Sequence, residues 1–233
     1  MNDDPRELTI DVEGAEPVSA LLRRPADATA LLVLAHGAGA GMRHAFMEAI
    51  ADRLARNGVA TLRYQFPYME AGRKRTDRPP VAQATVRAAV VAAAREAPEL
   101  DLFAGGKSFG GRMTSQAAAT AALPGVRGVV FLGFPLHPAG RPGIERADHL
   151  DRVKVPMLFV QGTRDALADL ALLDPVLDRL DDRARLHVVV GGDHSFHVPK
   201  RSGRTDGEVL DEIAAVVTAF VAAPDRFPRR GEG

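Results

Sequence analysis

Three residues that could together carry out acyl transfer each follow a short apolar run in the sequence. Ser108 is the centre of the pentapeptide Gly106-Lys107-Ser108-Phe109-Gly110, and Asp165 and His194 lie in loops farther along the chain. A serine hydroxyl is a poor nucleophile until a histidine removes its proton, and an acid beside that histidine fixes its tautomer. We therefore predict that Ser108, His194 and Asp165 form a catalytic triad.

The pentapeptide around Ser108 has the sequence context of a nucleophile elbow. It follows the apolar run 100–104 and precedes an alanine-rich stretch at 112–123 that favours a helix. Glycines two residues before and two residues after the serine permit the close backbone approach that this strained turn requires. The backbone N–H of Phe109, at the start of the helix, is the first donor that we expect for a substrate oxyanion.

Two aspartates compete for the role of the acid. Asp165 lies in the loop after the strand expected at 156–160, whereas Asp193 directly precedes His194. A lone aspartate in such a loop is more often a turn residue. Because side chains adjacent in the chain rarely face each other in a loop of this kind, we favour Asp165.

A glycine-rich loop supplies the second oxyanion donor that we expect. After the strand expected at 30–35 the chain reads His36-Gly37-Ala38-Gly39-Ala40-Gly41, which is pliable enough to direct a backbone N–H at the site. We favour the N–H of Ala38, with that of Gly39 next. The spacing differs from the G-x-G-x-x-G of dinucleotide-binding proteins, and no acidic residue ends the next strand, so a Rossmann site is not expected.

A basic segment follows the strand expected at 59–64 and contains Arg73, Lys74, Arg75 and Arg78. Most charge runs of this kind are solvated surface, but the segment could also rim the pocket and bind an anionic group of the substrate. His36 and His197 are expected to pack loops rather than act as bases. The candidate substrate contacts are Gly39, Arg43, Arg73, Arg75, Lys107 and His137.

The composition limits the classes of function. The 233 residues include 30 basic and 30 acidic side chains, so the overall charge balance gives no reason to expect nucleic-acid binding. The absence of cysteine excludes disulfides, thiolate metal sites and a cysteine nucleophile, and no cofactor or metal is expected. No apolar run approaches the length of a membrane span, so we expect a cytoplasmic protein. The predicted triad in turn leads us to expect a small-molecule acyl substrate.

Short strand-like runs alternate with helical patterns, which predicts an α/β fold with a mostly parallel eight-stranded sheet covered by helices on both faces. We expect a single domain over residues 1–223, a flexible tail at 224–233 and no sizeable lid. The first two strands are too close for a helix between them and should form a hairpin. The expected strands are 8–12, 19–23, 30–35, 59–64, 100–104, 128–132, 156–160 and 186–190, and the expected helices are 45–56, 81–96, 112–122, 170–180 and 207–221.

The elbow, the acid loop and the Gly-Asp-His-Ser-Phe segment at 192–196 together resemble the α/β-hydrolase superfamily, in which the triad has the chain order Ser, Asp, His. More narrowly, the chain resembles the small lidless branch of dienelactone hydrolases, to which the hydrolase-like domain of a histone-acetyltransferase-complex subunit is related. Dienelactone hydrolases use a cysteine where this chain has Ser108. The resemblance therefore implies acyl hydrolysis in general.

Two other functions remain open from the sequence. The fold could serve as a non-catalytic interaction domain, or the same triad could favour acyl transfer or peptide bonds over simple esters. Leaving-group and acyl preference depend on the shape of the pocket, which the sequence does not give. The oligomeric state also stays open.

Overall fold

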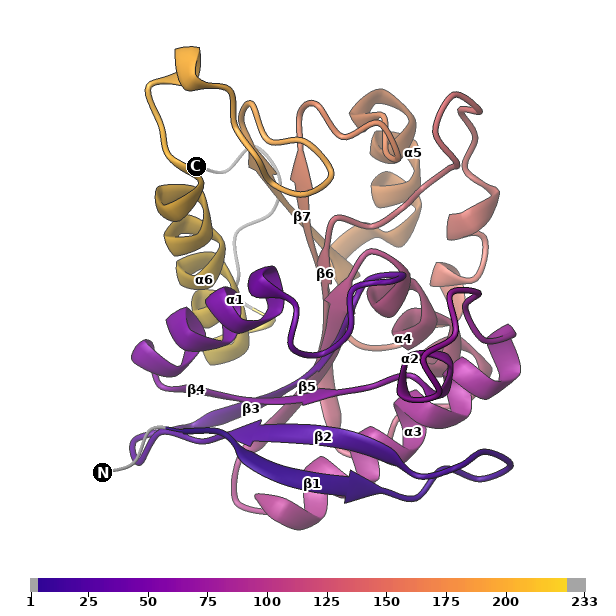
Figure 1. Cartoon of the computed structure of the whole chain (residues 1–233). Helices are drawn as coiled ribbons and strands as arrows, with labels where there is room; N and C mark the ends of the chain where they lie inside the picture. Colours follow the sequence, from indigo (N-terminus) through magenta and orange to yellow (C-terminus); the bar gives the residue numbers. More distant parts are fainter. Residues whose placement is uncertain (1–3, 226–233) are drawn as a thin grey trace.

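The computed structural model describes residues 4–225, which form one eight-stranded sheet with the strand order β1-β2-β4-β3-β5-β6-β7-β8 (Figure 1). Strand β2 is antiparallel to both of its neighbours, β1 and β4, and all other neighbouring strands are parallel. The predicted fold class is confirmed. The strands are β1 (Arg6–Ile10), β2 (Val18–Arg23), β3 (Ala30–Ala35), β4 (Val59–Tyr64), β5 (Asp101–Lys107), β6 (Val126–Leu132), β7 (Met157–Gly162) and β8 (Ala184–Val189).

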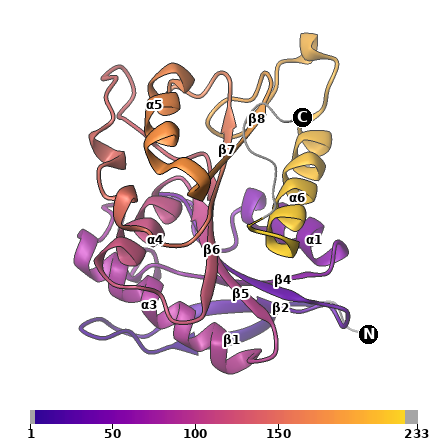
Figure 2. The same ribbon diagram turned by 180° about the vertical axis from the view of Figure 1, so that it is seen from behind.

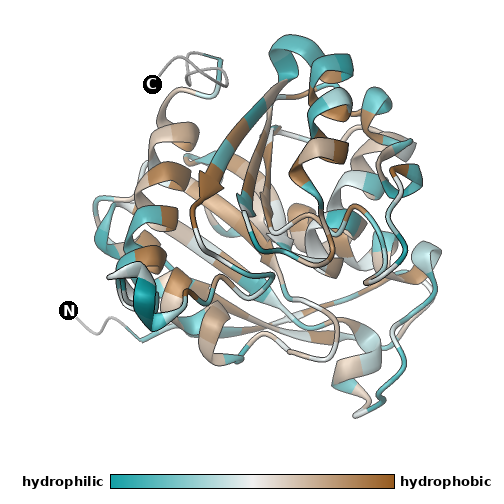
Figure 3. Ribbon diagram, turned by 90° about the horizontal axis from the view of Figure 1, so that it is seen from above, coloured by the Kyte–Doolittle hydropathy of each residue, from teal (hydrophilic) through white to brown (hydrophobic). Residues whose placement is uncertain are grey.

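Helices cover both faces of this sheet. Helices α1 and α6 pack against each other on one face, and α3, α4 and α5 lie on the other face (Figures 1 and 2). Apolar residues run along the strands and the helix sides turned toward them (Figure 3). The α-helices are α1 (Ala45–Arg56), α2 (Pro67–Glu70), α3 (Pro79–Glu96), α4 (Phe109–Thr120), α5 (Leu170–Leu180) and α6 (Asp206–Ala222).

The helix-capping signals in the sequence act as their chemistry predicts. α3 opens with Pro79 and Pro80, where the missing N–H of proline costs no helical hydrogen bond. α6 begins with a full capping box, in which Thr205 accepts from the N–H of Glu208 and the Glu208 carboxylate accepts from the N–H of Thr205. These caps fix where both helices begin.

The connection between β6 and β7 carries no large lid. Over residues 133–156 it contains only two 3-10 helices, Glu145–Ala147 and Leu150–Arg152. The expected C-terminal tail falls mostly on residues 226–233, outside the described residues. Within the described residues, no helix is both long and apolar enough to cross a membrane.

The short helix α2 and the extent of α4 differ from expectation. The sequence predicts a loop at α2, because four residues starting at a proline give no helical periodicity. α4 begins at Phe109, three residues before the predicted start at Arg112, because Gly110 and Gly111 obscured its first turn in the sequence. The helix therefore starts directly after the serine.

Backbone segments meet closely where β3, β5 and α4 cross. A Cβ atom on Gly110 would lie 2.6 Å from the carbonyl oxygens of both Ala35 and His36, and one on Gly106 would also overlap the Ala35 carbonyl oxygen. These atoms belong to the main chain and cannot move aside as a flexible side chain could. Glycine at 106 and 110 is therefore a requirement of the fold, as the elbow pattern predicted.

We expect Gly110→Ala to lower the free energy of unfolding by about 1–3 kcal/mol or more, because the added methyl group overpacks a main-chain contact. Gly207→Ala is a matched control, since Gly207 is also the second residue of its helix but a Cβ there meets only ordinary contacts at 3.7 Å. The control should be neutral or up to about 1 kcal/mol more stable. Urea unfolding of the two variants measures this, and equal stabilities would contradict the steric argument.

Candidate active site

Ser108 occupies the turn between β5 and α4 in a strained conformation. Its φ of 49° and ψ of −113° lie in a region that residues other than glycine rarely adopt. The turn is held from both sides, because the Ser108 N–H donates to the Leu132 carbonyl (3.1 Å) and its own carbonyl accepts from the N–H of Arg112 (3.1 Å). The surrounding structure thus imposes the geometry that presents the serine hydroxyl.

The structure brings the predicted serine, histidine and aspartate into one hydrogen-bonded chain. The Nε2 atom of His194 lies 2.8 Å from the Ser108 Oγ, and the Nδ1 atom lies 2.8 Å from Oδ2 of Asp165. The Asp165 side chain is 1% exposed, whereas the His194 side chain is 24% exposed. The imidazole is therefore open to a reacting group on one side and bound to a buried carboxylate on the other.

The Asp165 carboxylate is oriented by two further donors. Oδ2 accepts from Nε2 of Gln161 (2.6 Å), and Oδ1 accepts from the N–H of Leu167 (2.8 Å). The amide of Gln161 is itself fixed, because its Oε1 accepts from the N–H of Phe134 (2.9 Å). Hydrogen bonds to a carboxylate favour its charged form, which is the form that can hold an imidazolium.

Asp193 builds the loop that carries the histidine instead of contacting its ring. The Oδ1 atom of Asp193 accepts from the N–H groups of Ser195 (2.8 Å) and His197 (3.0 Å). The loop lies against the end of β7, where a side chain on Gly162 would overlap the carbonyl of Gly192. Of the two candidate acids, the geometry therefore favours Asp165.

A second serine–histidine contact lies in the core but lacks the features of a triad. Ser115 lies in the middle of α4. Its hydroxyl lies 2.7 Å from Nε2 of His149 and donates a hydrogen bond to the carbonyl of Arg112 (3.0 Å). Burial lowers the pKa of His149 to about 4. Among the described residues no carboxylate is hydrogen-bonded to His149, and Ser115 is fully buried. This pair is an internal contact between α4 and the β6–β7 connection.

The backbone N–H groups that we expect to hold an oxyanion are those of Phe109 and Ala38. Phe109 is the first residue of α4, so its N–H has no acceptor within the helix, and it points from a helix N-terminus. Gly39 donates to the Tyr68 hydroxyl (2.8 Å), so its N–H is already used. Among the described residues the Ala38 N–H has no acceptor, so Ala38 stays the donor that we predict, and the N–H of the alternative Gly39 is occupied by Tyr68.

The loop at 37–42 is tied to the end of β4 and the segment after it. Besides the Gly39–Tyr68 bond, the N–H of Met42 donates to Oε1 of Gln65 (2.9 Å), and Nη1 of the buried Arg63 donates to the Met42 carbonyl (3.1 Å). These supporting residues were missed in the sequence. No local pattern could have revealed them, because each bond joins residues 21 to 29 positions apart in the sequence.

His36 is a packing residue, as we expected. It is fully buried against the rings of Phe66 and Tyr68, and its Nε2 accepts from the N–H of Phe66 (3.2 Å). Burial lowers the pKa of His36 to about 4, so the ring stays neutral and keeps this acceptor at neutral pH.

A cavity of about 360 Å³ opens beside Ser108 and His194. Phe46, Met47 and Leu167 give it an apolar wall, while the two reactive side chains lie at its edge. A pocket with a few polar groups on an otherwise apolar lining is typical of small-molecule sites. Ala38, one of the two proposed oxyanion donors, also lines this cavity, as does the candidate contact Lys107.

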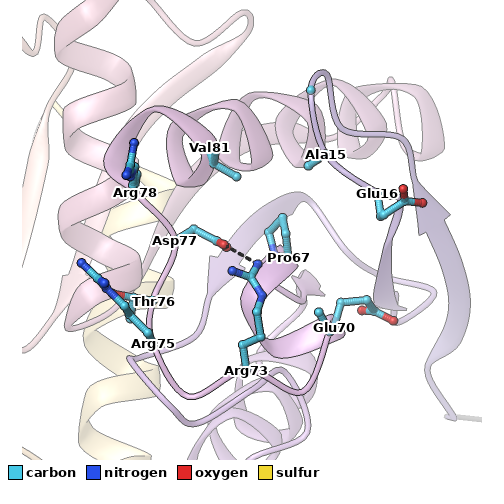
Figure 4. Close-up of a pocket in the computed structure, with 12 residues that line it drawn as sticks. Ala15, Glu16, Pro67, Glu70, Arg73, Arg75, Thr76, Asp77, Arg78 and Val81 are labelled. Atoms are coloured by element: carbon cyan, nitrogen blue, oxygen red, sulfur yellow. Dashed lines mark hydrogen bonds and ion pairs between the residues drawn. The ribbon is translucent and has the colours of Figure 1, made fainter.

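The arginines that we expected at the substrate pocket lie elsewhere. Arg73, Arg75 and Arg78 line a separate cavity of about 690 Å³ beside the β1–β2 turn, where Arg73 is turned toward the carboxylate of Asp77 (Nη2–Oδ1, 2.9 Å; Figure 4). The sequence placed them in the correct loop but could not show which way the loop folds. This corrects the expectation that Arg73 and Arg75 rim the pocket.

Two further expected contacts are corrected in the same way. Arg43 forms an ion pair with Glu7 and lines a different cavity beside β1 and β2. His137 is buried, and its Nε2 accepts from the N–H of Asp169 (3.2 Å). It therefore supports the loop after Asp165 and does not line the cavity at Ser108.

Solved structures with the same fold include several hydrolases. A dienelactone hydrolase from Anabaena variabilis is 22% identical, with a TM-score of 0.75 over 94% of this chain and 98% of its own. A serine hydrolase without a lid from Xanthomonas campestris is 21% identical, with a TM-score of 0.70 over 95% of each chain. An esterase domain from Rhodothermus marinus is 17% identical, with a TM-score of 0.71 over 93% of this chain and 97% of its own.

These likenesses establish a shared fold, of the small lidless kind found in dienelactone hydrolases. The sequence itself matches the family of α/β-hydrolase domains over residues 28–222, from just before β3 to the last residue of α6. The match includes all three strand-end loops that carry Ser108, Asp165 and His194. The chain belongs to the α/β-hydrolase domain family.

Proposed function

We propose that this protein is a serine hydrolase that cleaves a carboxylic ester or a related acyl bond through a covalent acyl-enzyme. The observation that carries the proposal is the continuous chain of 2.8 Å hydrogen bonds from Ser108 through His194 to Asp165, at the edge of an apolar cavity. The proposed substrate is a small molecule. The esterase and hydrolase names of the structural neighbours support the same reaction class.

The reaction follows from these positions. Nε2 of His194 takes the hydroxyl proton as the Ser108 Oγ attacks the acyl carbon, while Asp165 stabilises the imidazolium. The N–H groups of Phe109 and Ala38 hold the oxyanion. The imidazolium returns the proton to the leaving alcohol, which departs and leaves an ester on Ser108. Water, deprotonated by His194, then attacks that ester, and the acid product leaves as the serine regains its proton.

Acyl transfer to another acceptor uses the same first half of the reaction. The two outcomes differ only in whether water or a second nucleophile attacks the acyl-enzyme. With no large lid over the site, water has access to the acyl-enzyme, which favours hydrolysis. A purely non-catalytic role would leave the strained conformation of Ser108 without a use.

We expect Ser108→Ala to abolish labelling by a fluorophosphonate probe and to lower the turnover of p-nitrophenyl esters at least a thousandfold, to about the background set by binding alone. Ser115→Ala is the matched control, because it removes the other serine that contacts a histidine. The control should keep both labelling and turnover. Labelling that survives Ser108→Ala and disappears in Ser115→Ala would place the nucleophile in the core.

We expect Asp165→Asn to lower kcat by about ten-thousandfold, because its amide group favours the wrong histidine tautomer. Asp193→Asn should have a much smaller effect, since an asparagine oxygen can still accept from the N–H groups of Ser195 and His197. Steady-state kinetics on both folded variants measures the difference. A larger loss in Asp193→Asn would refute the assignment of the acid.

Tyr68→Phe should lower kcat by about tenfold to a hundredfold with little change in KM, because the loop that presents the Ala38 N–H loses its bond to Gly39. The control is Tyr64→Phe, which removes a hydroxyl from the only other tyrosine without touching Gly39. Equal kcat values for the two variants would show that the bond to Gly39 does not position the oxyanion donor.

A further inference from the structure

We propose that Lys107, through its ammonium group, is the positioning residue that holds the main chain of His194 in register with Ser108. The inference rests on the proposed serine-hydrolase function. It assigns to the second residue of Gly-Lys-Ser-Phe-Gly a role in the reaction that differs from the substrate contact expected from the sequence.

The contacts of Lys107 link three parts of the site. Lys107 is the last residue of β5, and its Nζ donates to the main-chain carbonyl of His194. The same Nζ lies 5.0 Å from the ring centre of Phe196 and 5.8 Å from that of Phe46 on α1. The ammonium therefore joins the nucleophile strand, the histidine loop and the first helix.

The room for this ammonium is provided by a glycine. A Cβ on Gly133 would lie 2.9 Å from Nζ of Lys107, so a larger residue there would displace it. The two phenylalanine rings stack at 6.0 Å and present their faces to the cation, an arrangement that is worth more when the charge is desolvated. The surroundings are therefore shaped for a charged lysine side chain.

A largely desolvated cation without a carboxylate in direct contact lowers the stability of the fold, which argues that the Lys107 ammonium serves a purpose. No salt bridge involves Lys107 within residues 4–225, and its titratable and charged neighbours are the carboxylates of Asp165 and Asp193 and the ring of His194. A methionine would fill similar space without the desolvation cost. The stronger hydrogen bond to the His194 carbonyl that a cation gives is the compensating feature.

His194 is thereby held at two points. Asp165 fixes its ring through Nδ1, and Lys107 fixes its carbonyl, so the direction of Nε2 toward Ser108 is defined by both. Phe196, two residues on, has a φ of 65°, and its N–H donates to the Asp193 carbonyl (2.9 Å), so this loop has a tight and strained turn. A loop of this kind loses its alignment if one of its anchors is removed.

Burial lowers the pKa of Lys107 to about 8, and the fields of Asp165 and Asp193 oppose this shift. The charged anchor is then complete below about pH 8 and is lost as the pH rises through that value. The effect of the Lys107 charge on the stability of the fold has the opposite sign to its effect on the contact. Because the folded pKa lies below the ordinary 10.5, the charge destabilises the fold below pH 8, and this cost disappears as the pH rises further.

The experiment compares wild type with Lys107→Met, and with Lys154→Met as a control at an exposed lysine. In wild type, kcat for a p-nitrophenyl ester should fall as the pH rises through about 8. In Lys107→Met, kcat at pH 7 should be about tenfold to a hundredfold lower, KM should stay within about twofold, and the fall near pH 8 should be absent. The control should behave as wild type.

Two further readouts separate the possible failures. Urea unfolding shows whether Lys107→Met is folded, and its stability relative to wild type should be highest below pH 8. If the fluorophosphonate labels wild type and the lysine variant keeps the wild-type kcat and pH profile, the inference is overturned while the proposed function stands. If wild type is not labelled, the proposed function fails, and ¹⁵N NMR of the His194 ring then tests the role of Lys107 separately. Unchanged ring signals in Lys107→Met would overturn the inference that Lys107 positions His194. Altered signals would support it.

Discussion

The arrangement of this protein depends on main-chain contacts that leave no room for a side chain. At the crossing of β3, β5 and α4, Gly110 meets two carbonyl oxygens, and at the ends of β7 and β8, Gly162 meets the carbonyl of Gly192. The first contact sets the position of the serine turn, and the second sets the distance between the acid and histidine loops. Short contacts between rigid backbones place atoms more accurately than flexible side chains could.

The reactive groups and their supports come from different halves of the sheet. β5, β7 and β8 carry the serine, the acid and the histidine, whereas β4 and the segment after it hold the glycine-rich loop through Arg63, Gln65 and Tyr68. On the proposed mechanism, the first half shapes the place where negative charge develops, and the second half supplies proton transfer. The strand order reverses between β3, which leads into the glycine-rich loop, and β5, which ends at the serine turn, and such a point is the usual place for a ligand in an open parallel sheet.

The features of the fold that could be predicted from the sequence are those that local patterns of residues encode. The eight strands and the hairpin each have signals within a few neighbouring residues, and so does the elbow around Ser108. The basic loop shows the limit, since charge alone did not reveal that Arg73 turns to Asp77. The bonds from Tyr68 to Gly39 and from Lys107 to His194 join residues 29 and 87 positions apart, and no local pattern encodes them.

The packing of α6 against α1 has a consequence for synthesis on the ribosome. Helix α1 is synthesised early but packs against α6, the last helix of the fold. His194 lies in the segment between β8 and α6. A growing chain therefore contains Ser108 well before His194 is synthesised, at elongation rates of about 5–20 residues per second. On the proposed mechanism, a nascent chain of this protein stays inactive toward acyl compounds until nearly all of the fold has emerged.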